Sequence, residues 1–424
     1  MECPARDRKN GMTQSNGTLS LNDLIDSRRE GHSMPQEFYT DAAVYLADVE
    51  RIFRRQWIFV GHSCQIIEAG EFFTVTIGSD PLIVIRGDDG VIRALHNVCR
   101  HRGTLISRES CGKARRLVCP YHQWTYERDG KLASCRGMHE INHDELGLLP
   151  VHLEDLEGML FVCLAETPPD FAAARAMMAP ILAPQRMGGA KVAKIVDYEV
   201  AANWKLVWEN NRECYHCNVN HPQYIKANFD HFNSDDTTPR VQERIDAATA
   251  RHTVQCAKHG LEVTHKETGM ATFPDSDHGL WFSANRTTLT EGYISETMDG
   301  QQVAPLMGDY TEADVGTMRC RTMPNMWNHS SCDHVVSTRL LPTAANRTQV
   351  RVMWLVHPNA EEGRDYKLEK LMPFWQLTSE QDWELCEFAQ TGISSSAYRP
   401  GPYSTHKEYN VDAFVRWYLE ALAQ

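Results

Sequence analysis

Four residues in the first third of the chain carry side chains that bind metals well. They stand as two pairs, Cys99-x-His101 and Cys119-x-x-His122, with seventeen residues between the pairs. Thiolate sulfur and imidazole nitrogen are both ligands of transition metals. We therefore predict that two loops, each with one cysteine and one histidine, together hold a metal centre.

Two kinds of metal centre use cysteine and histidine in equal number. A zinc site usually groups its cysteines and then its histidines, or uses four cysteines. Here a histidine of its own follows each cysteine. This order suits a Rieske [2Fe–2S] cluster, in which two thiolates bind one iron and two imidazoles bind the other. We expect the Rieske cluster and keep structural zinc as the alternative.

A second pair of histidines, His216 and His221, lies in the stretch ENNRECYHCNVNHP (209–222). Five residues rotate a helical side chain by roughly 140°, so an unbroken helix would not place both rings on one face. Pro222 disfavours helical geometry at His221, and a break there could bring the rings together. Two histidines and one carboxylate are the usual ligands of a mononuclear Fe(II) that reacts with O2, and we predict such a site.

The residues alone do not single out the carboxylate ligand. Acidic residues in helical settings include Glu209, Glu213, Glu380, Asp382, Glu384 and Glu387. A histidine pair near acidic residues is more often structural, but an upstream one-electron carrier needs an acceptor and so favours iron. Cys214 and Cys217 form a C-x-x-C around His216. We interpret it as neither a redox nor a zinc motif, because it has no second C-x-x-C and no thioredoxin-like pattern.

The elements that must position these residues divide the chain into four parts. Short β-type runs at 57–62, 71–78, 81–87, 91–98 and 156–165, with Asp-Gly turns between some of them, predict an all-β domain over 56–165. A polar segment, 1–33, is predicted to be a mobile arm, and 34–55 a helix capped by Thr40 or Asp41.

The remainder, 166–424, is predicted to be the iron-binding catalytic domain. Helical patterns cover 167–184 and 364–391, a strand and a helix follow each other near 191–211, and strands lie near 318–323, 335–343 and 348–358. The stretch 228–280 is polar and irregular and gives no clear element.

Composition excludes several classes of protein. The chain has 424 residues, 42% of them hydrophobic, and a net charge of −13, which argues against non-specific nucleic-acid binding. No window approaches the ~20 apolar residues of a membrane span. Thirteen irregularly spaced cysteines and an N-terminus without an apolar core argue against a secreted disulfide framework. We expect a cytoplasmic protein that binds neither nucleic acid nor membrane.

Several stretches resemble one family, the catalytic α subunits of Rieske non-heme iron oxygenases. CRHRG (99–103), CPYHQWTY (119–126) and NWKLVWENNRECYHCNVNHP (203–222) are similar to its cluster and iron motifs, and 380–404 is similar to its C-terminal helix. The resemblance covers roughly residues 35–420. It implies an α+β fold, with an all-β Rieske [2Fe–2S] domain and a helix-grip (START-like) antiparallel-sheet catalytic domain.

The same resemblance assigns roles to two acidic residues. Asp382 would be the third ligand of the mononuclear iron. Glu213 would be a bridge between a cluster histidine of one subunit and an iron-binding histidine of its neighbour in a head-to-tail homotrimer. No G-x-G-x-x-G after a strand and no P-loop occurs in the chain. Electrons from NAD(P)H would therefore arrive through a separate flavin/[2Fe–2S] reductase.

Within the family, the chain is similar to the branch that acts on quaternary ammonium compounds such as glycine betaine and stachydrine. The similarity rests on ENNRECYHC, MWNH (326–329), WLVH (354–357) and SAYRPGPYS (396–404) and weakens at the N-terminal arm and across 228–310. It implies that O2 and two electrons hydroxylate an N-methyl group, which then leaves as formaldehyde.

Aromatic faces hold a quaternary ammonium through cation–π attraction. The candidate substrate residues are Trp208, Tyr215, Trp281, Phe282 and Trp327, with His329 or Arg286 as candidates for a substrate carboxylate. Each of the aromatic residues could instead belong to the core. The competing functions are a ring-hydroxylating dioxygenase acting on an aromatic substrate, a monooxygenase of another small amine, and an electron-transfer protein without catalysis.

Overall fold

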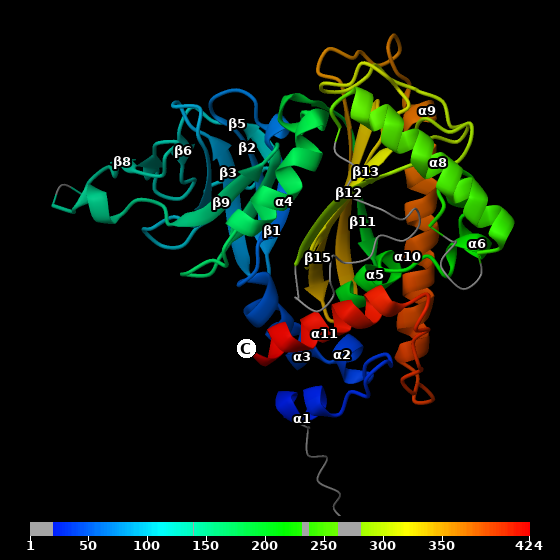
Figure 1. Cartoon of the computed structure of the whole chain (residues 1–424). Helices are drawn as coiled ribbons and strands as arrows, with labels where there is room; N and C mark the ends of the chain where they lie inside the picture. The colour runs from blue at the N-terminus through cyan, green and yellow to red at the C-terminus, as the bar shows by residue number, and fades with distance from the viewer. Residues whose placement is uncertain (1–19, 139, 231–236, 262–280) are drawn as a thin grey trace, which may run out of the picture.

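The computed structural model describes residues 20–138, 140–230, 237–261 and 281–424. Its strands form three sheets in which all neighbours pair antiparallel. A seven-stranded sheet has the order β1-β10-β9-β4-β3-β2-β5, a small sheet has the order β6-β7-β8, and a six-stranded sheet has the order β11-β16-β15-β14-β13-β12. Figure 1 shows the first two sheets on one side of the molecule and the third, with its helices, on the other.

The N-terminal sheets agree with the predicted β-type runs. Their strands are β1 (Ile58–His62), β2 (Glu71–Ile77), β3 (Asp80–Arg86), β4 (Ile92–His96), β5 (Cys111–Lys113), β6 (Leu117–Val118), β7 (Thr125–Tyr126), β8 (Leu132–Ser134), β9 (Pro150–Leu156) and β10 (Met159–Cys163). Gly90 has φ +79° in the turn between β3 and β4, a conformation that favours glycine. Each Cys/His pair lies in a connection between strands. Cys99 and His101 follow β4, and Cys119 and His122 lie between β6 and β7.

The C-terminal half is one sheet between two helical layers. Its elements are α4 (Ala172–Leu182), β11 (Lys191–Val200), α5 (Trp204–Asn211), α6 (Cys217–Asn220), α7 (Pro222–Ala227), α8 (Pro239–Lys258), β12 (Phe282–Thr287), β13 (Thr317–Thr322), β14 (Met326–Ser330), β15 (His334–Ala344), β16 (Arg347–Val356), α9 (Leu368–Leu371), α10 (Pro373–Ile393) and α11 (Tyr409–Ala423). Buried Met318, Cys320 and Met326 pack with Phe171 and Met178 beside α4. Helices α5 and α10 lie on the other side (Figure 1).

Alternation along β13 gives the sheet two chemically different faces. Met318 and Cys320 point into the apolar core, whereas Thr317, Arg319 and Arg321 point the other way. Arg319 donates to Asp230, and Thr317 donates to Glu296, so this second face is polar although it is buried. A polar, buried sheet face of this kind suits a binding site.

Several expectations about elements were wrong. Of the predicted mobile arm, residues 1–19 lie outside the described residues, but 20–33 contain α1 (Leu21–Asp26), whose Leu24 is buried. A bridge joins His32 to Pro402, so this segment packs on the C-terminal part of the chain. Helix α8 and strands β12 and β14 fall where no element was predicted. Helix α8 was not predicted because most of its residues are polar and only a few are buried, among them Ile245 and Ala248.

The predicted helix at 34–55 is divided into α2 (Glu37–Thr40), α3 (Ala42–Asp48) and a π-helical turn at Val49–Phe53. Asp41 caps α3, because its side chain accepts a hydrogen bond from the Ala43 N–H. No helix in the described part of the chain has both the length and the apolar character needed to cross a membrane. The four-part division of the chain at 33, 55 and 165 stays a prediction.

A fully buried ion pair joins this N-terminal segment to the C-terminal half of the chain. Lys205 Nζ lies 2.5 Å from Asp48 Oδ2, and both side chains are 0% exposed. Trp204 and Tyr418 donate further hydrogen bonds to the same carboxylate. Replacing one member of such a pair leaves the other charge buried without compensation. We expect Asp48→Asn to lower the free energy of unfolding by about 3–5 kcal/mol, measured by urea denaturation.

A surface pair offers the matched control. Glu68 and Lys113 are 66% and 53% exposed, so Glu68→Gln should leave the free energy of unfolding nearly unchanged. Equal, small losses in the two variants would show that the Asp48 carboxylate does not hold the two parts of the chain together.

Candidate functional site

The first Cys/His pair lies in the connection after β4, and the second lies in the turn between β6 and β7. Each cysteine is fixed by the backbone of its own loop. The Cys99 N–H donates to Thr104 O, and the Cys119 N–H donates to Trp124 O. Cys99 Sγ also lies 3.3 Å from the hydroxyl of Tyr126. Both thiols are buried and neither forms a disulfide.

The two histidines of these loops face each other at the tip of the domain. The ring centroids of His101 and His122 are 4.7 Å apart, and His101 also stacks on Trp124. Nδ1 of His101 is buried, and no described residue offers it a hydrogen bond. A buried nitrogen without a partner is costly unless it binds something. Two thiols and two imidazoles, one of them with this unpartnered nitrogen, fit a Rieske [2Fe–2S] cluster.

The second histidine pair occupies a break between two short helices. His216 stands just before α6, and His221 stands between α6 and α7 with φ −124° and ψ 65°. Pro222 then begins α7 as its first residue, a position where the missing N–H costs nothing. The expected helix break at His221 is confirmed, and it brings the two ring centroids to 5.1 Å.

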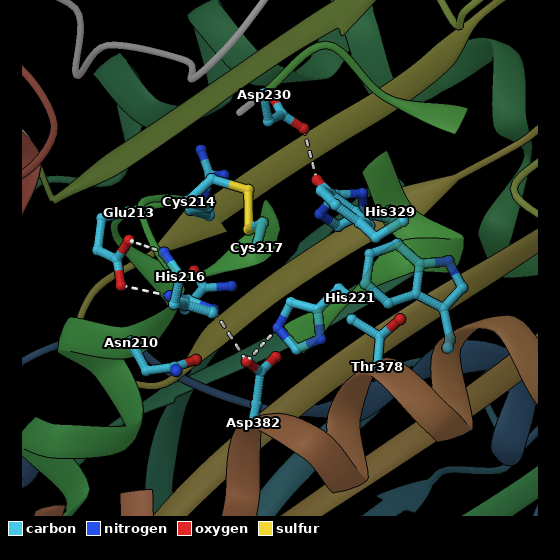
Figure 2. Close-up of a pocket in the computed structure, with 14 residues that line it drawn as sticks. Asn210, Glu213, Cys214, His216, Cys217, His221, Asp230, His329, Thr378 and Asp382 are labelled. Carbon is cyan, nitrogen blue, oxygen red and sulfur yellow. Dashed lines mark hydrogen bonds and ion pairs between the residues drawn. A yellow bond between two sulfur atoms is a disulfide. The ribbon is translucent and has the colours of Figure 1, made fainter. Parts of the chain in front are cut away.

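Asp382 of α10 reaches the same point from the opposite direction (Figure 2). Its Oδ1 lies 3.2 Å from His216 Nε2 and 2.9 Å from His221 Nε2. Two donor atoms on bonds of ~2.1 Å at a right angle lie about 3 Å apart, so these three atoms could surround one metal ion. Two imidazoles and one carboxylate, all largely buried, are the donor set of a non-heme Fe(II) site that reacts with O2.

Both imidazoles are held from behind through Nδ1. Glu213 Oε1 lies 2.5 Å from His216 Nδ1, and Gln381 Oε1 lies 2.9 Å from His221 Nδ1. Such partners fix the tautomer that leaves Nε2 free for a metal. Burial opposes protonation of His216, but Asp382 and Glu213 outweigh it and raise the pKa of His216 to about 10. The two carboxylates therefore make this position attractive to a cation.

The other candidate carboxylates lie elsewhere. Glu209 accepts a hydrogen bond from Tyr39, Glu380 from Gln376, and Glu387 from the Ala201 N–H, while Glu384 is exposed. Of the six, only Asp382 contacts Nε2 of both histidines.

The structure changes the interpretation of the C-x-x-C motif. Cys214 and Cys217 form a disulfide, a bond that the sequence reasoning did not predict. Cys217 Sγ lies within 4.8 Å of the two imidazoles, but a disulfide sulfur is a poor substitute for a thiolate ligand. The sequence missed this bond because the three-residue spacing is equally compatible with two free thiols.

A pocket opens beside the three convergent side chains. Its described lining consists of Asn210, Asn211, Glu213, Cys214, His216, Cys217, His221, Tyr224, Asp230, Arg321, His329, Trp375, Thr378 and Asp382. On one side, the ring of Trp375 lies 4.3 Å from that of His329 and 5.8 Å from that of Tyr224. The pocket thus combines an aromatic wall with buried charged groups.

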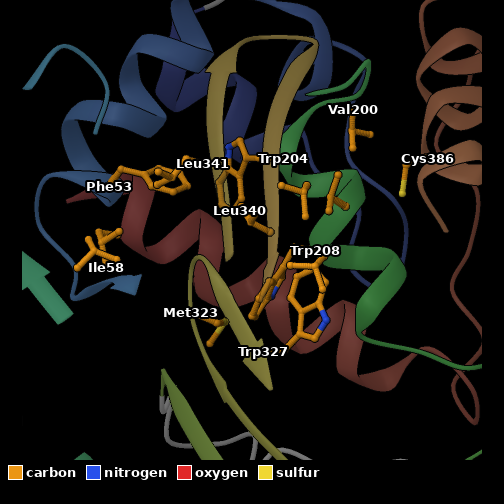
Figure 3. Packing of buried hydrophobic residues seen from close by; sticks show 14 of the residues in the cluster. Phe53, Ile58, Val200, Trp204, Trp208, Met323, Trp327, Leu340, Leu341 and Cys386 are labelled. Carbon is orange, nitrogen blue, oxygen red and sulfur yellow. The ribbon is translucent and has the colours of Figure 1, made fainter. Parts of the chain in front are cut away.

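Among the predicted substrate residues, only His329 is in that lining. Trp208 and Trp327 pack against each other in the core with centroids 5.7 Å apart (Figure 3). Trp281 and Phe282 contact each other, and Trp281 also packs on Phe171 near α4. Tyr215 is 60% exposed. These five residues lie outside the described lining, because sequence does not tell which face of a helix or strand meets the core.

Arg286 is also outside the described lining. Its guanidinium is buried and donates to Tyr310 and to Val315 O. The residues that the sequence reasoning missed are Trp375, Tyr224 and Arg321. One signal could have found Trp375: with Thr378 and Asp382 it stands at i, i+3 and i+7, on one face of α10. Arg321 stands two residues after Arg319 on β13, so both side chains point to the same face of the strand. A pair of arginines on one strand face is unusual in a core.

Comparison with known protein families gives two matches along the chain. Residues 56–147 match the Rieske [2Fe-2S] domain, and residues 187–424 match the ring hydroxylating alpha subunit (catalytic domain). The first match contains both Cys/His pairs, and the second contains His216, His221 and Asp382.

Several characterised relatives are similar over most of the chain. The glycine betaine monooxygenase oxygenase subunits of Chromohalobacter salexigens and Pseudomonas aeruginosa are 41% and 40% identical over 403 residues, which is 94% of this chain and 88% and 91% of theirs. The carnitine monooxygenase oxygenase subunit of Escherichia coli is 34% identical over 208 residues, 46% of this chain and 54% of its own.

Solved structures share the fold. The quaternary ammonium Rieske monooxygenase CntA in complex with γ-butyrobetaine has a TM-score of 0.68 at 21% identity, with 95% of this chain and 99% of that chain covered. Naphthalene 1,2-dioxygenase with indole bound has a TM-score of 0.63 at 20% identity, with 96% and 95% covered. The predicted fold class is confirmed, but the fold alone does not distinguish an amine from an arene as substrate.

Proposed function

Because the chain belongs to the Rieske oxygenases as a catalytic alpha subunit, we propose that it uses O2 to remove an N-methyl group from a betaine. Its cofactors are a Rieske [2Fe–2S] cluster and a mononuclear iron. The observation that carries the choice of substrate is the 41% identity to a glycine betaine monooxygenase over nearly the whole chain. The aromatic wall of the pocket supports it.

We assign the cofactors to the residues that fit them. Cys99, His101, Cys119 and His122 would hold the cluster, and His216, His221 and Asp382 would hold the iron. When bound, the cluster supplies single electrons and the mononuclear iron activates O2. The chain itself orients the imidazoles through Glu213 and Gln381 and encloses the substrate between α10, α7 and β13.

The pocket can distinguish a quaternary ammonium from a primary amine. A trimethylammonium group has no N–H to donate, so polar acceptors gain little from it, whereas aromatic faces attract its charge. Trp375 is 7% exposed and Tyr224 is 9% exposed, so both would meet the substrate in a nearly dry site. We assign the ammonium group to this wall, in place of the tryptophans that the sequence suggested.

The overall reaction balances with one molecule of O2. Glycine betaine, O2, two electrons and two protons give dimethylglycine, formaldehyde and water. One oxygen atom enters the N-methyl C–H bond, and the other leaves as water. The resulting N-hydroxymethyl compound then breaks its C–N bond and releases formaldehyde. NAD(P)H supplies the two electrons through a separate reductase.

We propose four further features on the strength of family membership. The chain would work in the cytoplasm as a head-to-tail homotrimer, and it would receive electrons from a flavin/[2Fe–2S] reductase. Glu213 would connect His216 to a cluster histidine of the adjacent subunit, since its carboxylate already lies against His216 Nδ1 and the Tyr215 N–H.

Formaldehyde release tests this proposal. Purified protein, a surrogate reductase and NADH are supplied with glycine betaine, stachydrine, carnitine, choline and indole in parallel. We expect formaldehyde from a betaine, in step with O2 uptake, and none from indole. The iron content should be about three per chain, two from the cluster and one mononuclear.

Three results would contradict the proposed N-demethylation of a betaine. A hydroxylated arene without formaldehyde would establish the dioxygenase. Formaldehyde from an amine other than a betaine would establish another amine monooxygenase. Two irons per chain with a reducible cluster and no O2 uptake with any substrate would establish an electron-transfer protein.

A further inference from the structure

Arg321 is a buried cation with no ion-pair partner among the residues that the structure describes. It lies on β13, is 9% exposed and lines the pocket that contains His216, His221 and Asp382. No hydrogen bond and no ion pair joins its guanidinium to a residue that the structure describes. A guanidinium carries five N–H donors, and leaving them without acceptors in a buried site is costly.

Arg319, two residues earlier on the same strand, has hydrogen-bond acceptors for its guanidinium. Arg319 points to the same side of β13 and is 3% exposed. It donates to Asp230 Oδ1 and to Asn228 Oδ1, both at 2.7 Å. Asp230 also accepts a hydrogen bond from Tyr224. The Asp230 carboxylate is therefore already engaged by Arg319, and no described carboxylate forms an ion pair with Arg321.

Neighbouring positive charges at Arg321 also favour the binding of an anion. Burial and the adjacent Arg319 lower the pKa of Arg321, although Tyr224 and Asp230 oppose the shift. Arg212, also buried, is repelled by the same guanidinium. A carboxylate placed against Arg321 would relieve this repulsion and accept two parallel hydrogen bonds from the planar guanidinium.

We propose that Arg321 binds the carboxylate of the substrate and so restricts the enzyme to betaines, that is, quaternary ammonium compounds that carry a carboxylate. This inference rests on the proposed function. Arg321 and the Trp375–Tyr224 wall line the same pocket, so one zwitterion could use both ends of it. With the carboxylate fixed, an N-methyl group is directed towards His216, His221 and Asp382. Arg321 is thus a specificity-determining residue for the reaction.

The test compares glycine betaine with its amide, which has the same shape but no negative charge. Formaldehyde release gives KM and kcat for both compounds with the unaltered protein, a surrogate reductase and NADH. We expect KM to be at least about 30-fold lower for the acid, as expected for a charge-assisted pair in a buried site. Equal KM values for acid and amide would overturn the inference while leaving N-demethylation intact.

Variants then locate the effect. Arg321→Gln should raise KM for the acid by about 30-fold, leave KM for the amide nearly unchanged and abolish the preference. Arg321→Lys keeps the charge but loses the fork, so its preference should be intermediate. Arg347→Gln, an exposed arginine in the same sheet, should behave as the unaltered protein. Only variants that show an intact Rieske spectrum and full iron content are included in the comparison. If Arg321→Gln does not fold, the preference of Arg321→Lys for the acid over the amide tests the proposal instead.

Two outcomes distinguish a failure of the proposed N-demethylation from a failure of the Arg321 assignment. If the unaltered protein releases formaldehyde from neither compound, the proposed function fails, and the assignment of Arg321 fails with it. If it prefers the acid and Arg321→Gln keeps that preference, the function stands and the assignment of Arg321 is wrong.

Discussion

Asp382→Ala is expected to abolish formaldehyde release while leaving the Rieske cluster in place. Asp382 is the only carboxylate among the six candidates that contacts Nε2 of both His216 and His221. Without it, two imidazoles are left to hold a divalent ion, and a metal site with a ligand removed loses most of its affinity. We expect turnover to fall by at least about 10³-fold and iron to fall from about three to about two per chain.

Glu384→Ala is the matched control for this variant. Glu384 stands two residues further along the same helix and is exposed, so its loss should change neither iron content nor turnover. Visible absorption of the cluster is measured in both variants, because it reports the four ligands of the N-terminal domain independently. An Asp382→Ala protein that still turns over substrate would refute the ligand assignment.

Glu213→Gln is expected to slow turnover by about 10²-fold or more with all irons retained. The side chain keeps nearly its shape, but the negative charge against His216 Nδ1 disappears. That charge orients the imidazole and makes it a stronger ligand, and in our proposal it also connects His216 to the cluster of the adjacent subunit. The measurement is formaldehyde release with the reductase, together with iron content.

Hydrogen peroxide separates these roles, because it carries O2 and two electrons in one molecule. If Glu213 serves electron delivery, peroxide should restore formaldehyde release in Glu213→Gln but not in Asp382→Ala. Failure of peroxide to restore Glu213→Gln would mean that the carboxylate acts only by holding His216. Unchanged turnover with the reductase would mean that Glu213 has neither role.

Local patterns predicted much of the N-terminal half. Strand periodicity, Asp-Gly turns and the spacing of the two Cys/His pairs are encoded within a few residues of each other, and the structure has the corresponding strands and loops. Helix α8 was missed because only a few of its twenty residues are buried and its sequence reads as polar. Packing of 20–33 against the C-terminal part was missed because it depends on residues nearly 400 positions away.

The candidate site was predictable to the extent that its parts are close in sequence. His216 and His221 could be paired through the break at Pro222, but Asp382 lies more than 160 positions further on and is brought in by the packing of α10 against α5 and α7. Only the family resemblance selected it from six acidic residues. The position of the predicted aromatic residues relative to the pocket could not be read for a related reason: burial of Trp208 and Trp327 in the core and exposure of Tyr215 are properties of the folded chain.

The central claim is that this chain cleaves an N-methyl group with O2, and a single turnover tests it most directly. Protein in which the cluster and the mononuclear iron are both chemically reduced, so that each holds one of the two electrons required, is mixed without reductase with glycine betaine carrying ¹³C in its methyl groups, and O2 is then admitted. We predict ¹³C-formaldehyde and dimethylglycine in equal amounts, rising in proportion to the mononuclear iron and absent in Asp382→Ala. Oxidation of the cluster with unchanged glycine betaine and no labelled formaldehyde would contradict the claim.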